Sequence, residues 1–371
     1  MFSQKCEQFV VRYCRTFSLN VNNASVAHTN IEYSYSQRIL NHSTTEIDAF
    51  CHGFIHSLNE NLSSIQEKQK HINHIRNDLN RFFNQKEIEL VPIGSASNLL
   101  LTKSSDLDLV LLPSKQEHLW KQFMTKFNNN VGYKVAYMKN IEKQLKNLRI
   151  SKGRVLCITT ARIPIIRFET KQKLEVDIQF GNIEPIRSTL FVRTCVEYDD
   201  RVRLLAHWLH QKFVLAGILK GVNGFFSRYH VNVLVLHFLQ AIPYPVLPDI
   251  IKLSPWLSSD NSWHNAVKVL NKQGSLYVPH NQVPNESSVG TLIVQLVDYF
   301  SQIDFNQHAI DTKGRILERK DKEKSVEMID EYFDASTCYV ANGSQLLTNF
   351  FSNLKCVIDS KDYEELFRIS T

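Results

Sequence analysis

The sequence predicts an α+β fold, in which a mixed sheet with helices packs against a largely helical part of the chain. Short apolar runs that are typical of strands gather between residues 70 and 186. Elsewhere, apolar residues recur at three- and four-residue steps, the spacing of amphipathic helices. The 371 residues are 43% hydrophobic and 22% charged, which is the composition of a globular protein with a substantial core.

The predicted strands are bounded by polar or glycine-containing segments. They are EIELVPIG (87–94), DLDLVLL (106–112), RVLCITTARIPIIRFET (154–170) and LEVDIQFG (174–181), with KQK at the turn between the last two.

Helical spacing flanks this sheet on both sides. One predicted helix carries Ile47, Phe50, Phe54 and Leu58, and the next carries Ile72, Ile75, Leu79 and Phe82. Residues 200–239 form a helical stretch that breaks near 217–224, and 288–305 form a further helix. We therefore expect a poorly patterned segment at 1–43, a mixed unit at 70–186, and a helical unit built from 44–69 and 187–371.

Net charge, cysteine spacing and hydropathy limit the partners and the compartment that we expect for this protein. The net charge of +6 is a mild bias toward anionic partners. The seven cysteines form no C-x-x-C pair, which argues against a zinc site or a disulfide framework and favours a reducing compartment. No stretch is long and apolar enough to span a bilayer, so no membrane partner is expected. The first thirty residues hold one acid, Glu7; an organelle presequence could look like this, but a cytoplasmic or nuclear location is favoured over a mitochondrial one.

Two aspartates interrupt the apolar run DLDLVLL. Alternate side chains of a strand share a face, so Asp106 and Asp108 point to the same side. Two carboxylates this close repel each other unless a cation lies between them. A lone D-x-D also occurs at solvent-facing strand ends, so this pair alone is a weak indication of a metal site.

A third carboxylate and a glycine turn strengthen the indication. In LEVDIQF, Asp177 falls on the face opposite to the apolar residues, where it could complete a cluster of three carboxylates for two divalent ions. The preceding GSASN, beginning at Gly94 and Ser95, places backbone N–H groups and a hydroxyl after a strand, as a phosphate-binding turn does. Together they indicate nucleoside triphosphate chemistry.

This pattern resembles the signature of the DNA polymerase β-type nucleotidyltransferases. Later blocks, among them ARIPIIRF (161–168), SRYHVNVLVLHFLQ (227–240) and SVGTLIVQLVDYFSQIDF (288–305), resemble those of the noncanonical poly(A) polymerases and terminal uridylyltransferases. The resemblance covers about residues 70 to 345. It implies a nucleotidyltransferase catalytic domain at 70–186, a central, poly(A)-polymerase-associated domain in the helical unit, and a cleft between them.

The resemblance also implies roles for individual residues. Asp106, Asp108 and Asp177 match the ligands of two Mg²⁺ (or Mn²⁺) ions, and Asp177 also matches the acceptor of the proton from the attacking 3′-hydroxyl. Gly94 and Ser95 match the triphosphate turn. The remaining predicted nucleotide contacts are Ser188 and Thr189 near the ribose, His210 and Lys212 near the triphosphate, Ser227 and Arg228 in the S-S-Y block, and Tyr229, on which the base would stack.

Several of these positions depart from the family pattern. Ser188 stands where the family has asparagine, and Arg228 stands for the second serine of S-S-Y. An ungapped alignment puts His210 at the lysine that usually serves the triphosphate, so Lys212 or Arg228 could replace that charge. No histidine occurs in DEYFDASTCYVAN (330–342), which argues against strict uridine selection and leaves A, U or a mixed tail open.

A basic helix near 139–149 is a candidate RNA track. Ile141, Leu145 and Leu148 form its apolar stripe, and the predicted RNA-binding residues are Lys139, Lys143, Lys146 and Arg149. A solvated helix face is the alternative reading.

The sequence therefore predicts a template-independent RNA 3′-end nucleotidyltransferase that uses NTPs and two divalent ions. No RNA-recognition module is evident, so an RNA-binding or adaptor protein is the expected source of target choice. Two alternatives remain: an inactive scaffold with the same fold, and a nucleotidyltransferase with a non-RNA acceptor.

Overall fold

A computed structural model describes residues 31–84, 88–113, 116–161, 163–219, 225–254, 257, 263–280, 284–319, 326–330, 340 and 342–369. Residues 1–30 of the predicted N-terminal segment, residues 220–224 of the predicted helix break near 217–224, residues 320–325 and most of 330–342 lie outside these residues. Within them, no helix is both long and apolar enough to cross a membrane.

The central element is a five-stranded mixed sheet with the strand order β1-β2-β5-β4-β3. Its strands are β1 (Glu89–Ile93), β2 (Leu107–Leu112), β3 (Leu156–Ile158), β4 (Ile165–Glu169) and β5 (Glu175–Phe180). The β2–β5 pair is parallel, whereas β1–β2, β4–β5 and β3–β4 are antiparallel. The segment 154–170, predicted as a single strand, is a hairpin of β3 and β4. Pro164 immediately precedes β4, where a residue without an N–H suits a strand start.

The two faces of this sheet belong to different hydrophobic cores. Leu107, Leu109 and Leu111 of β2 pack in one core with helices α3 (Leu62–Asn84), α4 (Glu117–Asn129) and α5 (Val131–Asn147). Val110 and Leu112 point the other way, into the core of the helical unit. The alternation of β2 therefore directs one face toward α3–α5 and the other toward the helical unit.

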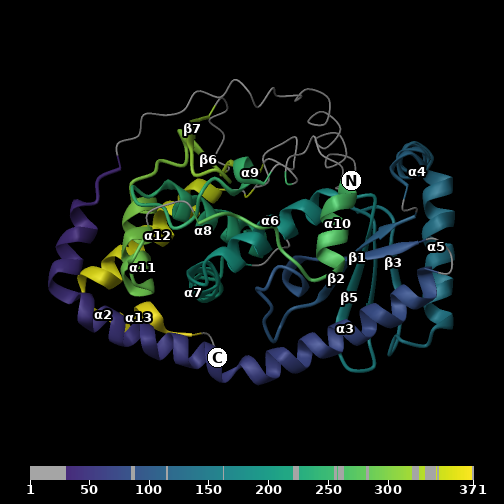
Figure 1. Ribbon diagram of the computed structural model, residues 1–371, viewed down its shortest axis with the longest axis horizontal. Helices are drawn as coiled ribbons and strands as arrows, with labels where there is room; N and C mark the ends of the chain where they lie inside the picture. The colour runs from purple at the N-terminus through teal and green to yellow at the C-terminus, as the bar shows by residue number, and fades with distance from the viewer. Residues whose placement is uncertain are drawn as a thin grey trace, which may run out of the picture.

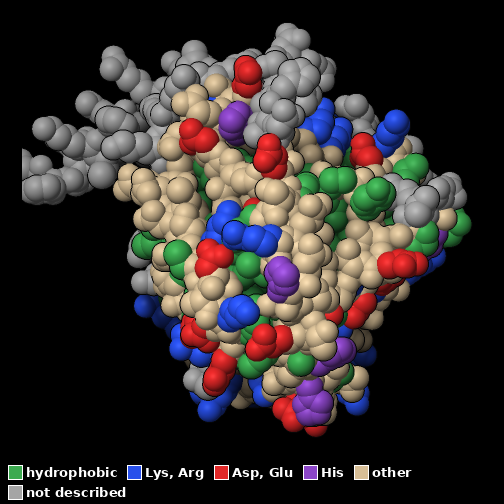
Figure 2. All heavy atoms as spheres, turned by 90° about the vertical axis from the view of Figure 1, so that its left-hand side faces the viewer, with side chains coloured by type: hydrophobic (Ala, Val, Ile, Leu, Met, Phe, Trp, Pro, Cys, Tyr) green, Lys and Arg blue, Asp and Glu red, His purple; other side chains and the backbone are tan. Residues whose placement is uncertain are grey.

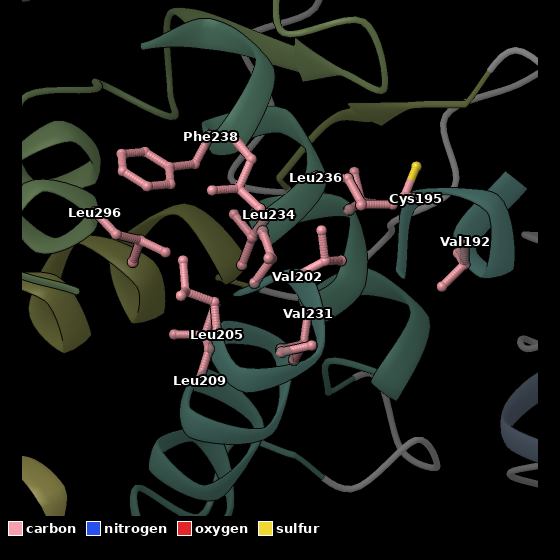
Figure 3. Close-up of a cluster of buried hydrophobic side chains, with 14 of the residues drawn as sticks. Val192, Cys195, Val202, Leu205, Leu209, Val231, Leu234, Leu236, Phe238 and Leu296 are labelled. Atoms are coloured by element: carbon pink, nitrogen blue, oxygen red, sulfur yellow. The ribbon is translucent and has the colours of Figure 1, made fainter. Parts of the chain in front are cut away.

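The helical unit is built around four helices, α6 (Glu184–Tyr198), α7 (Arg201–Leu215), α8 (Arg228–Ala241) and α11 (Val289–Ser301). Figure 3 shows the centre of its core, where Leu205 of α7, Leu234 of α8 and Leu296 of α11 meet. Its other elements are α2 (Ser34–Glu60), the single-turn η2 (Gly94–Ala96) at its border with the sheet, α9 (Ile250–Leu253), α10 (Trp263–Asn271), α12 (Gly343–Asp359), α13 (Tyr363–Phe367), and a small sheet of β7 (Ile316–Glu318), β6 (His308–Asp311) and β8 (Met328–Ile329). The sequence did not predict this second sheet, because its strands have only two to four residues.

Figure 1 shows how the two units are joined. The five-stranded sheet, α4 and α5 lie toward one end, and α11, α12 and α13 lie toward the other. Helices α2 and α3 run along one edge of the molecule; α2 packs against α11 and α13, and α3 packs against β1. The long N-terminal helices therefore tie the helical unit to the sheet.

Helix α2 begins at Ser34, earlier than the predicted start at Thr44, because a buried acid holds its first turn. The carboxylate of Asp298, 1% exposed on α11, accepts a hydrogen bond from the backbone N–H of Ser36 at 3.0 Å. Lys355 of α12 lies 3.7 Å from the same carboxylate. A turn with few apolar residues is thus fixed by a tertiary contact that sequence periodicity does not report.

We expect Asp298→Ala to lower the free energy of unfolding by about 3 kcal/mol, because it leaves a buried N–H and a half-buried ammonium without their shared partner. Denaturant unfolding measures this change. Arg38→Ala, at an exposed pair with Asp359, is the control and should change it by less than about 0.5 kcal/mol. Equal stability of the two variants would contradict this account.

Candidate active site

Parallel pairing of β2 and β5 brings two carboxylates together. Asp108 and Asp177 are direct partners in the register of these strands. Asp106 precedes β2 by one residue, and the strand alternation puts it on the side of Asp108. This is the side that faces the helical unit, opposite to the side of Leu107 and Leu109. The predicted shared face of the aspartates is therefore what the strand register gives.

The pKa of Asp108 reflects its buried position beside other carboxylates. Burial, and to a smaller extent the neighbouring carboxylates of Asp106 and Asp177, raise the pKa of Asp108 to about 7, against the opposing charges of Arg167 and Arg228. A carboxyl group with this pKa is half protonated at neutral pH unless additional positive charge reaches it. The negative charge of the three carboxylates is therefore not fully neutralised by the protein, and a bound cation would stabilise it. Oxygen ligands suit Mg²⁺ or Mn²⁺.

Asp177 has a protein partner that the sequence analysis missed. Arg167 donates from Nε to Oδ1 of Asp177 at 2.7 Å and from Nη2 to Oδ2 at 2.5 Å. The hydrogen bonds to Asp177 raise the pKa of Arg167 above its usual range. Among the described residues, no three His, Cys, Asp or Glu side chains are arranged as a ready metal-binding group, and both oxygens of Asp177 are engaged by Arg167.

The register of the β4–β5 hairpin explains this pair. Arg167 and Asp177 are direct partners across the two antiparallel strands, whose turn is closed between Thr170 and Leu174. The two residues lie equally far from that turn. Counting outward from the predicted KQK turn could have identified the pair, because facing residues of a hairpin share a side of the sheet.

The glycine turn lies directly beside Asp108. Gly94 has a φ of 63°, and a β-carbon there would lie 3.1 Å from Oδ2 of Asp108. Both facts favour glycine, because other residues are strained at positive φ and would crowd the carboxylate. The N–H of Gly94 donates to Oγ1 of Thr189 on α6 at 3.0 Å. Ser95 is partly exposed within η2.

Of the predicted ribose contacts, Thr189 lies at this turn and Ser188 is directed elsewhere. The hydroxyl of Ser188 donates to the carbonyl of Pro185 in its own helix at 3.3 Å. Both side chains are at least 95% buried.

The N-terminus of α8 carries the S-S-Y-like block. Ser227 caps the helix and accepts a hydrogen bond from the N–H of His230. The hydroxyl of Tyr229 donates to the carboxylate of Asp330, which is 1% exposed. The side chain of Arg228 extends to the segment at 102–105, just before Asp106. The sequence analysis did not single out Asp330, since only its tertiary contact to Tyr229 distinguishes it.

Lys212 is not brought to this site. Its ammonium donates to the carbonyls of Glu365 and Arg368, and it lines a hollow of about 330 Å³ between α7 and α12. His210, two residues earlier, is on another side of α7. Burial, together with the charge of Arg228, lowers the pKa of His210 to about 4. At neutral pH His210 is uncharged, so neither residue supplies a positive charge at the turn.

The basic helix lies away from the carboxylates. Ile141 and Leu145 of α5 pack on the sheet face of Leu107 and Leu109, which is opposite to the face of Asp108 and Asp177. Both Lys139 and Lys146 donate to Glu142 at 2.7 Å. Lys143 and Arg149 are exposed. The predicted RNA residues are thus on the surface, but half of them already share an acid.

Comparison with solved structures defines the class of fold. GLD-2 in its complex with RNP-8 aligns with a TM-score of 0.68 at 20% identity, over 87% of this chain and 98% of that chain. Cid1, an RNA terminal uridylyl transferase, aligns with a TM-score of 0.64 at 20% identity, over 88% of this chain and 99% of that chain. The fold is the α+β fold of these nucleotidyltransferases.

Sequence comparison specifies the family further. Residues 48–197 match the central palm domain of the mitochondrial-like poly(A) RNA polymerases. Human poly(A) RNA polymerase GLD2 is 28% identical over 257 residues, which are 68% of this chain and 50% of that protein. Caffeine-induced protein 16 of Schizosaccharomyces pombe is 27% identical over 248 residues, 64% of this chain and 19% of that protein. The chain is therefore related to the noncanonical poly(A) polymerases and spans half or less of the length of these two relatives.

The raised pKa of Asp108 predicts a pH-dependent stability in the absence of divalent ions. Between the ordinary pKa of 3.8 and the folded value of about 7, the folded state keeps a proton that the unfolded state has lost. Raising the pH through this window therefore lowers the free energy of unfolding. Asp108→Asn cannot ionise, so it should remove this contribution and be more stable than the wild type at pH 8 by about 2 kcal/mol, less than the full shift implies because the side chain is partly exposed.

Chemical unfolding of both proteins in a chelator, from pH 4 to pH 8, measures this difference. Subtracting the two curves removes the titration of the other acids. Parallel curves would contradict the raised pKa of Asp108.

Proposed function

We propose that this protein is a template-independent RNA 3′-end nucleotidyltransferase that adds ribonucleotides from NTPs. The observation that carries the proposal is the register pair of Asp108 and Asp177, with Asp106 on the same side and the Gly94–Ser95 turn against Asp108. Carboxylates that can hold divalent ions beside a phosphate-binding turn are the arrangement that metal-assisted, in-line phosphoryl transfer uses.

Asp106, Asp108 and Asp177 would hold two Mg²⁺ or Mn²⁺ ions. These ions, when bound, supply the charge that stabilises the triphosphate and the pyrophosphate leaving group. The raised pKa of Asp108 supports the fit, because its causes are burial and the neighbouring carboxylates, and a bound cation would offset both. Arg167 would fix the orientation of the Asp177 carboxylate, and each carboxylate oxygen has a further lone pair with which it could bind an ion.

The remaining roles fall to groups around the carboxylates. Ser95 and the backbone of the turn would bind the triphosphate, with Thr189 fixing Gly94 from α6. Tyr229, oriented by Asp330, would stack on the incoming base. Asp177 would accept the proton of the 3′-hydroxyl as that oxygen attacks the α-phosphate. Ser188, Ser227 and His210 would act only through packing and capping.

The relatives support this function and leave its finer details open. Solved neighbours include mtPAP in complex with UTP and a Cid1 variant bound to MgATP. A, U or a mixed tail all fit these neighbours. We place the protein in the cytoplasm or nucleus, with mitochondria less favoured, and expect an adaptor protein, as the GLD-2/RNP-8 complex illustrates for that relative.

The direct test incubates the purified chain with labelled RNA, Mg²⁺ and each NTP separately, followed by sequencing of the products. Extended RNA supports the proposal. Absence of extension with every NTP would favour an inactive scaffold, and transfer to a non-RNA acceptor in a parallel screen would favour the other alternative.

We expect Asp108→Ala and Asp177→Ala each to reduce nucleotide addition by about 10³-fold or more, because each removes a ligand and none of the remaining groups substitutes for it. Circular dichroism should show that both variants stay folded. A variant that retains tailing would refute the role of that aspartate.

We expect RNA binding by α5 to depend most on Lys143 and Arg149, because the other two predicted RNA-binding residues form ion pairs with Glu142. Charge reversal in the double variant Lys143→Glu/Arg149→Glu should raise the Kd for single-stranded RNA by about tenfold at low salt and reduce the slope of log K against log salt. Lys139→Glu should do less, since Lys139 is already paired with Glu142.

Filter binding over a salt series measures both effects. A reversal at Lys252, exposed on α9, is the control. Figure 2 shows that acidic and basic side chains are mixed among the described residues of the face that it presents. Equal effects of the α5 and α9 reversals would leave the solvated-face interpretation in place.

A further inference from the structure

Arg228 connects the helical unit to the segment that carries the first aspartate. Its Nη1 donates to Oγ1 of Thr102 at 3.2 Å and to Oγ of Ser105 at 2.9 Å, and its Nη2 donates to Oγ of Ser104 at 2.9 Å. One guanidinium from the first turn of α8 is thus shared by three hydroxyls of the sheet unit. We call Arg228, Thr102, Ser104 and Ser105 the hydroxyl clasp.

Two of the three hydroxyls, those of Thr102 and Ser105, also belong to a hydrogen-bonded turn. The N–H of Thr102 donates to Oγ of Ser105 at 2.9 Å, and the N–H of Ser105 donates to the carbonyl of Thr102 at 3.1 Å. The hydroxyls of Thr102 and Ser105 are 2.9 Å apart, and Ser105 is 2% exposed. This closed turn ends directly at Asp106. Any displacement of the turn therefore displaces the carboxylate that follows it.

The acceptors of the clasp are neutral, which is unusual for a mostly buried arginine. Hydroxyls satisfy the N–H groups without neutralising the charge, whereas a carboxylate would do both. Burial lowers the pKa of Arg228, and the negative charges of Asp106 and Asp108 partly oppose this effect. The guanidinium is thus fixed in direction by hydroxyls while its charge remains available to the carboxylates.

We propose that Arg228 is a positioning residue that fixes Asp106 and sets the spacing between the two units through the hydroxyl clasp. The inference rests on the proposed function, since the group that it positions is a proposed metal ligand. Tyr229 follows Arg228 directly, so the same contact also sets the distance from Tyr229 to the Gly94–Ser95 turn. A nucleotide that touches both the turn and Tyr229 binds best when that distance is fixed.

Hydrogen exchange tests the clasp without any catalysis. In the full chain, without ligands and in a chelator, Arg228→Ser should increase amide exchange within residues 99–108 by about tenfold, because a charged donor to three acceptors is lost. The double variant Thr102→Val/Ser104→Ala leaves Arg228 intact and should give a similar increase. Arg38→Ser, the same charge change at an exposed site of α2, should leave this exchange unchanged. Unchanged exchange in both clasp variants would overturn the proposal.

A double-mutant cycle separates positioning from direct contact with the triphosphate. Arg228→Ser should raise the KM for the NTP about tenfold with a smaller effect on kcat, and it should add little when Thr102→Val/Ser104→Ala is already present. Arg228→Lys should rescue only in part, because the compact ammonium lacks the two separated nitrogens, Nη1 and Nη2, from which the guanidinium reaches the three hydroxyls. Additive effects, or full rescue by lysine, would overturn the clasp in favour of a simple charge at the phosphates.

The results of these two experiments distinguish an error in the role of Arg228 from an error in the proposed function. A wild-type chain that adds no nucleotide contradicts the function, while the exchange result still reports on the clasp. An active wild type whose exchange and KM are unaffected by clasp variants contradicts only the role of Arg228.

Discussion

The parallel pairing of β2 with β5 is the constraint on which the rest of the site depends. It places Asp108 and Asp177 side by side, and the alternation of β2 adds Asp106 to the same face. Burial of Asp108, together with the nearby carboxylates, raises the pKa of this residue to about 7. The opposite face of the same strands, with Leu107, Leu109 and Val176 fully buried, stabilises the pairing that the carboxylates oppose.

Positively charged side chains from two different parts of the fold approach these carboxylates. Arg167 approaches from the neighbouring strand, and Arg228 approaches from the helical unit. The N–H of Gly94 is turned to Thr189 on α6, which joins the turn to the helical unit as well. The candidate site is therefore not a property of the sheet alone. It exists where the sheet face, α6 and the first turn of α8 meet, and α2 and α3 hold these units together along one edge (Figure 1).

Much of this arrangement is encoded by patterns that span a few residues. Period-two alternation in DLDLVLL and LEVDIQF correctly assigned the polar and apolar faces, and helical spacing located α7, α8 and α11. What could not be predicted depends on pairs distant in sequence. Arg167 is defined by hairpin register, Asp330 by its bond to Tyr229, and the early start of α2 by Asp298. Lys212 was wrongly expected at the triphosphate, because spacing alone did not show that α7 turns it toward the carbonyls near the C-terminus.

The central claim is that the paired strands gather carboxylates for divalent ions, and Mn²⁺ binding tests it most directly. Paramagnetic resonance of Mn²⁺ with a non-hydrolysable NTP counts bound ions and does not require turnover. The account predicts two bound ions per chain, with at least one lost when Asp108 is replaced by Asn and again when Asp177 is replaced by Asn. Unchanged Mn²⁺ binding in both variants would contradict it.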